Sequence, residues 1–146
     1  MFGWFKKASS PPPGDGKADP EPPASPPEQI RANAALVIRI ASDQLGVTIG
    51  CDEAGVRWPD GYIQRQHEQG DPSTRDGLTS TLGSFLGECI IQGFGGAWAQ
   101  DNGSWCVRFD ERNAAFPFAK VAKQLEDGRE ESVLSFYTLV PVLFTR

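Results

Sequence analysis

The fold class is decided by the stretch Ala97-Trp-Ala-Gln-Asp-Asn-Gly-Ser-Trp-Cys-Val-Arg-Phe109. At its centre, Asn102-Gly103 is the residue pair favoured in a type I′ turn, because both residue types tolerate positive φ. After the turn, apolar residues alternate from Trp105 to Phe109, which places them on one face of a strand. We therefore predict an antiparallel β-hairpin over residues 97–109.

A third strand is expected after the hairpin, at about residues 114–118. Pro117 has no N–H to donate to a neighbouring strand, so this strand lies at a sheet edge or ends there. On both sides of the strands, apolar residues recur three or four positions apart, which is typical of amphipathic helices. The order of these patterns predicts a single α+β domain, a three-stranded antiparallel sheet packed by about five helices.

Polar residues, glycines and prolines mark the expected ends of these helices. The first helix runs from Glu28 to a stop at Gly46, and the fourth covers residues 119–127. The expected N-caps are Asp52, Asp76 and Ser132, the expected start or restart of the second helix is Trp58-Pro59, and the expected stops are Gly70, Gly93 and Pro141.

The first 27 residues differ in composition from the rest of the chain. Eight of the 12 prolines lie there, and residues 8–27 contain no Leu, Ile, Val or aromatic residue. Such a segment cannot bury enough apolar surface to offset its ordering entropy, and its prolines favour extended polyproline II. We expect residues 1–27 to be a disordered Pro-rich tether and residues 28–146 to be one globular domain.

The first seven residues, Met1-Phe-Gly-Trp-Phe-Lys-Lys7, combine aromatic and basic side chains. Their order is the reverse of a signal peptide, because the apolar residues precede the lysines and no apolar region follows. This peptide either docks on a partner protein, inserts weakly into an anionic bilayer surface, or has no role in the fold. Near the other end of the chain, the apolar residues Val142-Leu143-Phe144 must be packed in the domain or bound by a partner. The candidate partner-binding residues are Phe2, Trp4, Phe5, Lys6, Lys7 and Phe144.

The charge balance argues against a nucleic-acid partner. The chain has 14 Lys and Arg against 19 Asp and Glu, a net charge of −5, and the whole deficit lies in residues 28–146. An acidic domain repels a phosphate backbone, and no basic stripe interleaved with aromatic residues occurs. No run of about 18 apolar residues is present, so a transmembrane segment is not expected.

The residues that usually carry chemistry are few. Cys51, Cys89 and Cys106 are widely spaced, which favours three ordinary thiols in a reducing cytosol, with Cys89 and Cys106 buried. The only histidine, His67, lies in a Gln- and Glu-rich segment and is expected to be solvated. Gly93-Phe-Gly-Gly96 follows a helix and precedes a strand, the reverse of a phosphate-binding loop. We therefore expect no catalytic residues, no cofactor and no metal.

One region contains candidates for a structural or ligand-binding role. Gly83 and Gly87 lie four residues apart inside a helix, where each costs about 1 kcal/mol relative to Ala, so we expect close packing against another element. Glu88 is either a solvated helix residue or an acceptor for backbone N–H groups at the Gly95-Gly96 turn. If a pocket exists, we expect it where Glu88, Trp98 and Lys120 converge.

The same region carries a family resemblance. The segments Leu82-Gly-Ser-Phe-Leu-Gly-Glu88, Gly95-Gly-Ala-Trp98 and Phe116-Pro-Phe-Ala-Lys-Val121, followed by Gly128 and Ser132 to Tyr137, resemble the pattern of DUF3806-like domains, small bacterial domains of unknown function. The resemblance spans about residues 53–140. It implies a stable fold and a cytoplasmic protein, and it transfers no catalytic residue.

The predicted function is a non-enzymatic cytoplasmic module that binds another protein, as an immunity-like or adaptor protein of a bacterial system. The acidity, the absence of a catalytic constellation and the apolar C-terminal tail favour this hypothesis. One alternative is an enzyme or small-ligand-binding protein with a pocket near Glu88, Trp98 and Lys120. Another is a peripheral membrane protein held by residues 1–7.

Overall fold

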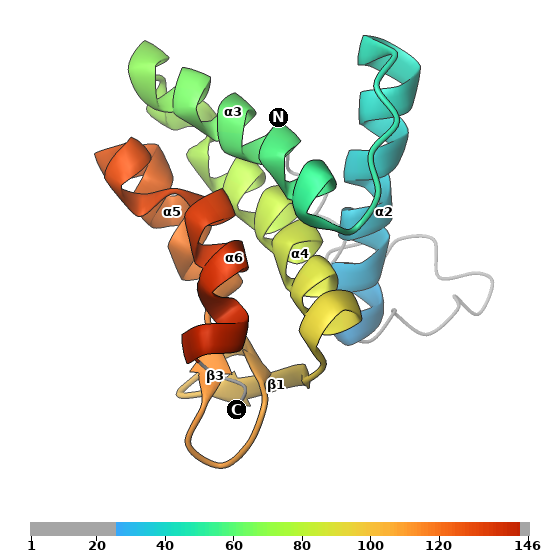
Figure 1. Cartoon of the computed structure of the whole chain (residues 1–146). Coiled ribbons are helices and arrows are strands. Elements are labelled where there is room, and N and C mark those ends of the chain that lie inside the picture. Colours follow the sequence, from blue (N-terminus) through green and yellow to red (C-terminus); the bar gives the residue numbers. More distant parts are fainter. Residues whose placement is uncertain (1–25, 144–146) are drawn as a thin grey trace, which may run out of the picture.

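The computed structural model describes residues 26–143 and confirms the α+β fold. Figure 1 shows α4 at the centre, with α2 on one side and α5 and α6 on the other, and the sheet beyond the C-terminal end of α4. The elements are α2 (Pro26–Leu45), α3 (Glu53–Gln69), η1 (Pro72–Thr74), α4 (Arg75–Phe94), β1 (Ala97–Asp101), β2 (Ser104–Arg108), β3 (Ala114–Ala115), α5 (Pro117–Asp127), η2 (Arg129–Glu131) and α6 (Val133–Leu143).

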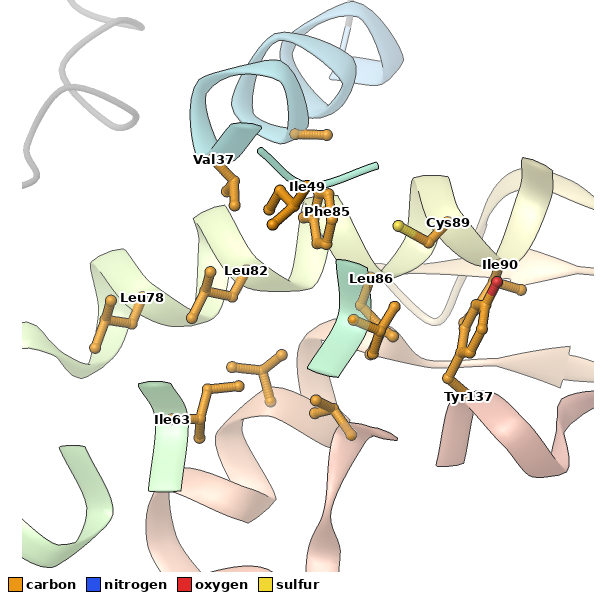
Figure 2. Close-up of a cluster of buried hydrophobic side chains, with 14 of the residues drawn as sticks. Val37, Ile49, Ile63, Leu78, Leu82, Phe85, Leu86, Cys89, Ile90 and Tyr137 are labelled. Carbon is orange, nitrogen blue, oxygen red and sulfur yellow. The ribbon is translucent and has the colours of Figure 1, made fainter. Parts of the chain in front are cut away.

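Helix α4 is the centre of the hydrophobic core. It is buried on nearly all sides, because α2, α5 and α6 all pack against it. A helix with apolar or small residues all round is typical of a core position rather than a surface position. Figure 2 shows its apolar side chains meeting those of the neighbouring segments; the labelled residues are Val37, Ile49, Ile63, Leu78, Leu82, Phe85, Leu86, Cys89, Ile90 and Tyr137.

The hairpin has the predicted turn. Asn102 and Gly103 both have positive φ, 54° and 82°, as a type I′ turn requires. The register pairs Trp98 with Val107 and Asp101 with Ser104, so the two turn residues connect the strands directly. The hairpin is therefore confirmed.

The third strand is shorter than predicted. Only Ala114 and Ala115 pair with β2, and α5 begins at Pro117 instead of Ala119. Proline suits the first position of a helix, because its N–H would have no partner there and its φ is already helical. Pro117 therefore starts a helix, and the prediction of a strand up to residue 118 was wrong.

The second helix is continuous, whereas a short helix and a restart at Trp58 were expected. Asp52 caps it as predicted, accepting a hydrogen bond from the backbone N–H of Gly55 at 2.8 Å. Pro59 lies inside α3 without ending it, and Val56 and Ile63 on the same stripe are fully buried. Their packing offsets the one backbone hydrogen bond that a proline removes.

Four other helix ends differ from the prediction, and the first is the start of α2, which begins at Pro26 instead of Glu28 and so includes the last two residues of the segment predicted to be a disordered tether. Asp76 does not cap α4; it lies in the first turn, and Asp71 caps the preceding η1 turn, accepting from Ser73 N at 3.0 Å. Helix α4 continues past Gly93 to Phe94 and ends at Gly95, whose φ is 95°. Pro141 lies within α6, which reaches Leu143. A proline in a last turn removes only one backbone donor, so it does not end the helix.

Candidate functional site

An open cleft of about 570 Å³ lies between α2, α4, α5 and β2. Three aromatic side chains form much of its wall: Trp105 from the hairpin, and Phe116 and Phe118 from the start of α5. We call this site the aromatic cleft. Its described lining residues are Pro26, Gln29, Ile30, Asn33, Thr79, Ser80, Ser84, Ser104, Trp105, Phe116, Phe118, Ala119 and Ala122, and none of them carries a charge.

The position of Phe118 depends on a glycine of α4. A Cβ at Gly83 would lie 2.4 Å from Phe118 Cδ1 and 2.9 Å from Phe118 Cα, so only glycine allows α5 to approach this closely. The Phe118 ring also contacts the Trp98 ring, with 5.7 Å between the ring centroids. The close packing expected at Gly83 is thus confirmed, and it fixes one aromatic wall of the cleft.

Gly87 has the same role one turn later. A Cβ there would lie 2.1 Å from Cη2 and 2.4 Å from Cζ2 of Trp98. The indole N–H of Trp98 in turn donates a hydrogen bond to Glu88 Oε2 at 2.8 Å. Two environments were predicted for Glu88: solvent, or the backbone N–H groups of the Gly95-Gly96 turn. Both predictions were wrong, because the carboxylate binds the Trp98 indole.

The glycines after α4 serve the hairpin. Gly95 and Gly96 both have positive φ, 95° and 94°. A Cβ at Gly96 would lie 2.8 Å from Val107 Cγ1, so this residue permits close contact between the chain and β2. Gly95 and Gly96 thus shape the connection from α4 to β1, a structural role.

Lys120 contacts residues other than Glu88 and Trp98. Its Nζ lies 2.6 Å from Glu131 Oε1 and 5.6 Å from the centroid of the Phe136 ring. The hydrogen bond and the positive charge of Lys120 lower the pKa of the Glu131 carboxyl. Lys120 lines a smaller depression of about 280 Å³ beside α5 and η2, whose described lining includes Phe136. The structure thus joins Glu88 with Trp98 and places Lys120 in a separate ion pair.

A buried polar network that the sequence did not suggest joins α3 to α5 and α6. Asp60 Oδ1 accepts from the Ser132 hydroxyl at 2.6 Å and from the Leu134 backbone N–H at 3.2 Å. The buried Gln124 side chain donates to the Asp60 carbonyl at 3.3 Å and accepts from Val133 N at 2.9 Å. Asp60 therefore caps α6 from another helix, while the Ser132 hydroxyl oxygen accepts the predicted cap bond from Ser135 N at 3.1 Å.

His67 is not the solvated side chain that was predicted. Its Nδ1 lies 3.0 Å from the carbonyl oxygen of Leu125 at the end of α5. A Cβ at Gly128 would lie 2.8 Å from His67 Nε2, so the imidazole packs directly against that glycine. The histidine thus joins α3 to α5.

The cysteines agree with the prediction that Cys89 and Cys106 are buried, and Cys51 is half-buried. Among residues 26–143, no group of three or more His, Cys, Asp or Glu side chains is placed to hold a metal ion.

No helix within residues 26–143 is long and apolar enough to span a bilayer. The candidates Phe2, Trp4, Phe5, Lys6, Lys7 and Phe144 lie outside the described residues.

Comparison with known proteins gives no match: no family model, no curated protein and no solved structure is similar to this chain. The resemblance to DUF3806-like domains stays a prediction.

Proposed function

We propose that this protein is a non-enzymatic cytoplasmic protein-binding module whose aromatic cleft holds an extended, uncharged segment of a partner protein. The composition of the cleft is the observation that supports this proposal. Its described lining combines Trp105, Phe116 and Phe118 with hydroxyl and amide side chains and has no charged group. Aromatic walls suit apolar or proline side chains, and the hydroxyl and amide groups suit backbone N–H and C=O groups.

The size of the site is consistent with a short peptide segment. About 570 Å³ lies in the range of ordinary ligand sites, about 300–1,000 Å³. Aromatic-lined grooves bind Pro-rich segments well, because a polyproline II helix is already extended and loses little entropy on binding. A charged segment would lose its hydration in this cleft without gaining an opposite charge.

The residues proposed for an alternative enzymatic pocket have structural partners. Glu88 accepts a hydrogen bond from Trp98, and Lys120 pairs with Glu131. These contacts favour the binding module over an enzyme or small-ligand site near Glu88, Trp98 and Lys120. An immunity-like or adaptor role in a bacterial system is the concrete form of the proposal.

The proposal is tested by selecting binders for the full chain from a displayed library of random peptides. We expect enriched peptides to be rich in proline and aliphatic residues and to lack charge. Their binding should fall at least tenfold in Ala122→Arg, because this exposed alanine lines the cleft and arginine would obstruct it with a charged side chain.

Ala35→Arg is the matched control. Ala35 is an exposed alanine of α2 that does not line the cleft, and it should leave peptide binding unchanged. The proposal is refuted if no peptide is enriched, if the enriched peptides are mainly charged, or if Ala122→Arg binds them as well as Ala35→Arg does.

A further inference from the structure

The segment between α2 and α3, residues 46–52, lies against the side of α4. Ile49 from this segment is buried in the same core cluster as Phe85 and Cys89 of α4. Figure 2 shows Ile49 next to Phe85, and Cys89 one turn further along α4 with its sulfur directed toward this segment. Cys51, two residues after Ile49, packs against the same core cluster.

The two cysteines lie close together between this segment and α4. Cys51 follows Ile49 by two residues, at a bend just before α3. One turn of helix from Phe85 to Cys89 advances about 6 Å on one face. Ile49 and Phe85 belong to the same core cluster as Cys89, Cys51 packs against that cluster, and each of the two cysteines shifts the pKa of the other, so the two thiols are neighbours.

The segment that carries Cys51 is held on its other side by α3. A Cβ at Gly55 would lie 1.6 Å from the carbonyl oxygen of Gly50, so the segment and the first turn of α3 are in direct backbone contact. Asp52, the next residue after Cys51, caps the same helix. The fold therefore presents Cys51 to Cys89 in a defined position.

We propose that Cys51 and Cys89 are a redox-active dithiol, which disulfide oxidants such as glutathione disulfide convert into an intramolecular disulfide between the α2–α3 segment and α4. This modification is independent of the peptide-binding function proposed above. Cys51 is half-buried and Cys89 is buried, so the oxidant reaches Cys51 first.

The ionisation of the two thiols supports this order of events. The hydrogen bond from the Cys89 thiol lowers the pKa of Cys51, whereas that same contact and burial raise the pKa of Cys89. The thiolate is the reactive form of cysteine, so Cys51 is the attacking residue.

The reaction has two balanced steps. The Cys51 thiolate attacks one sulfur of glutathione disulfide, forms a mixed disulfide and releases one glutathione thiolate. Cys89 then loses its proton to this thiolate or to water and attacks the Cys51 sulfur, which releases the second glutathione. Two protein thiols are oxidised to one disulfide, and one glutathione disulfide is reduced to two thiols.

The test incubates the folded full chain with glutathione disulfide and then counts free thiols in denaturant and maps disulfides by peptide mass. We expect two of the three thiols to disappear and a Cys51–Cys89 cross-link to form. Cys106→Ser is the matched control, since Cys106 lies buried on β2, and it should form the same cross-link.

Two further variants separate the steps. Cys89→Ser should stop at a stable mixed disulfide on Cys51, because the second thiol is missing. Cys51→Ser should keep Cys89 and Cys106 reduced while the protein is folded, which circular dichroism verifies. The proposal is overturned if the parent chain stays fully reduced, stops at the mixed disulfide, or cross-links either cysteine to Cys106.

Discussion

The central prediction concerns the glycines that bring α4 against its neighbours. In Gly87→Ala, the new Cβ would lie 2.1 Å from Cη2 of Trp98 and 3.1 Å from Cγ of Pro117. No real Cβ tolerates the first distance, so the Trp98 ring must move away from α4. That movement also strains the hydrogen bond of 2.8 Å from the Trp98 indole to Glu88.

The expected magnitude follows from two opposing effects. Replacing a helical glycine by alanine favours the folded state by about 1 kcal/mol. Overpacking costs about 1–3 kcal/mol, and weakening a hydrogen bond to a charged group adds about 1 kcal/mol. We therefore expect Gly87→Ala to lower the free energy of unfolding by about 1–3 kcal/mol.

Gly83→Ala should be at least as damaging. Its Cβ would meet the backbone of Phe118 at 2.9 Å as well as the ring, and a helix backbone cannot rotate away as a side chain can. The two helices α4 and α5 must then separate. Because Phe118 lines the aromatic cleft, the same substitution should also weaken binding of the selected peptides.

The assay is urea unfolding followed by circular dichroism, with Gly61→Ala as the control. Gly61 lies inside α3, and a Cβ there would meet only the Arg65 side chain, at 3.6 Å. Alanine should therefore stabilise the protein by about 0.5–1 kcal/mol at this position. If Gly87→Ala and Gly83→Ala are as stable as Gly61→Ala, the packing argument is refuted.

Two predictions concern buried polar contacts. Asp60→Ala leaves the Ser132 hydroxyl and the Leu134 N–H without their acceptor. We expect it to lower the free energy of unfolding in urea by about 2–5 kcal/mol. A double-mutant cycle with Ser132→Ala that shows no coupling would contradict this. Glu88→Gln keeps an acceptor for the Trp98 indole but loses its charge, so we expect a loss of about 0.5–1.5 kcal/mol, and unchanged or higher stability would contradict the structural role of Glu88.

The parts of the fold that sequence analysis predicted are those that depend on neighbouring residues. The Asn102-Gly103 turn was recognisable because positive φ is a local requirement. The close packing at Gly83 and Gly87 was also predictable, since an interior helix glycine needs a compensating contact. Pro59 and Pro141 misled the prediction, because the packing that carries a helix through a proline involves distant segments.

The polar partners were not predictable for the same reason. Asp60 is 72 residues from Ser132, and His67 is 58 residues from Leu125. Glu88 could be placed near the turn before Trp98, but whether it meets backbone or indole depends on where that ring packs. The aromatic cleft is what remains between α2 and α5 after both have packed on α4, so no local pattern indicates it.

Helix α4 carries both proposed sites, yet on different faces. Ser80 and Ser84 line the aromatic cleft, whereas Phe85 and Cys89 face the α2–α3 segment. Phe85 follows Ser80 by five residues, and Cys89 follows Ser84 by five. At about 100° per residue, five residues turn the helix by 500°, which leaves the two side chains about 140° apart around its axis. Oxidation of Cys89 therefore alters the side of α4 away from the cleft, and peptide binding should be the same in the reduced and oxidised protein. The two proposals stand or fall separately, because Ala122→Arg blocks only the cleft and Cys51→Ser removes only the dithiol.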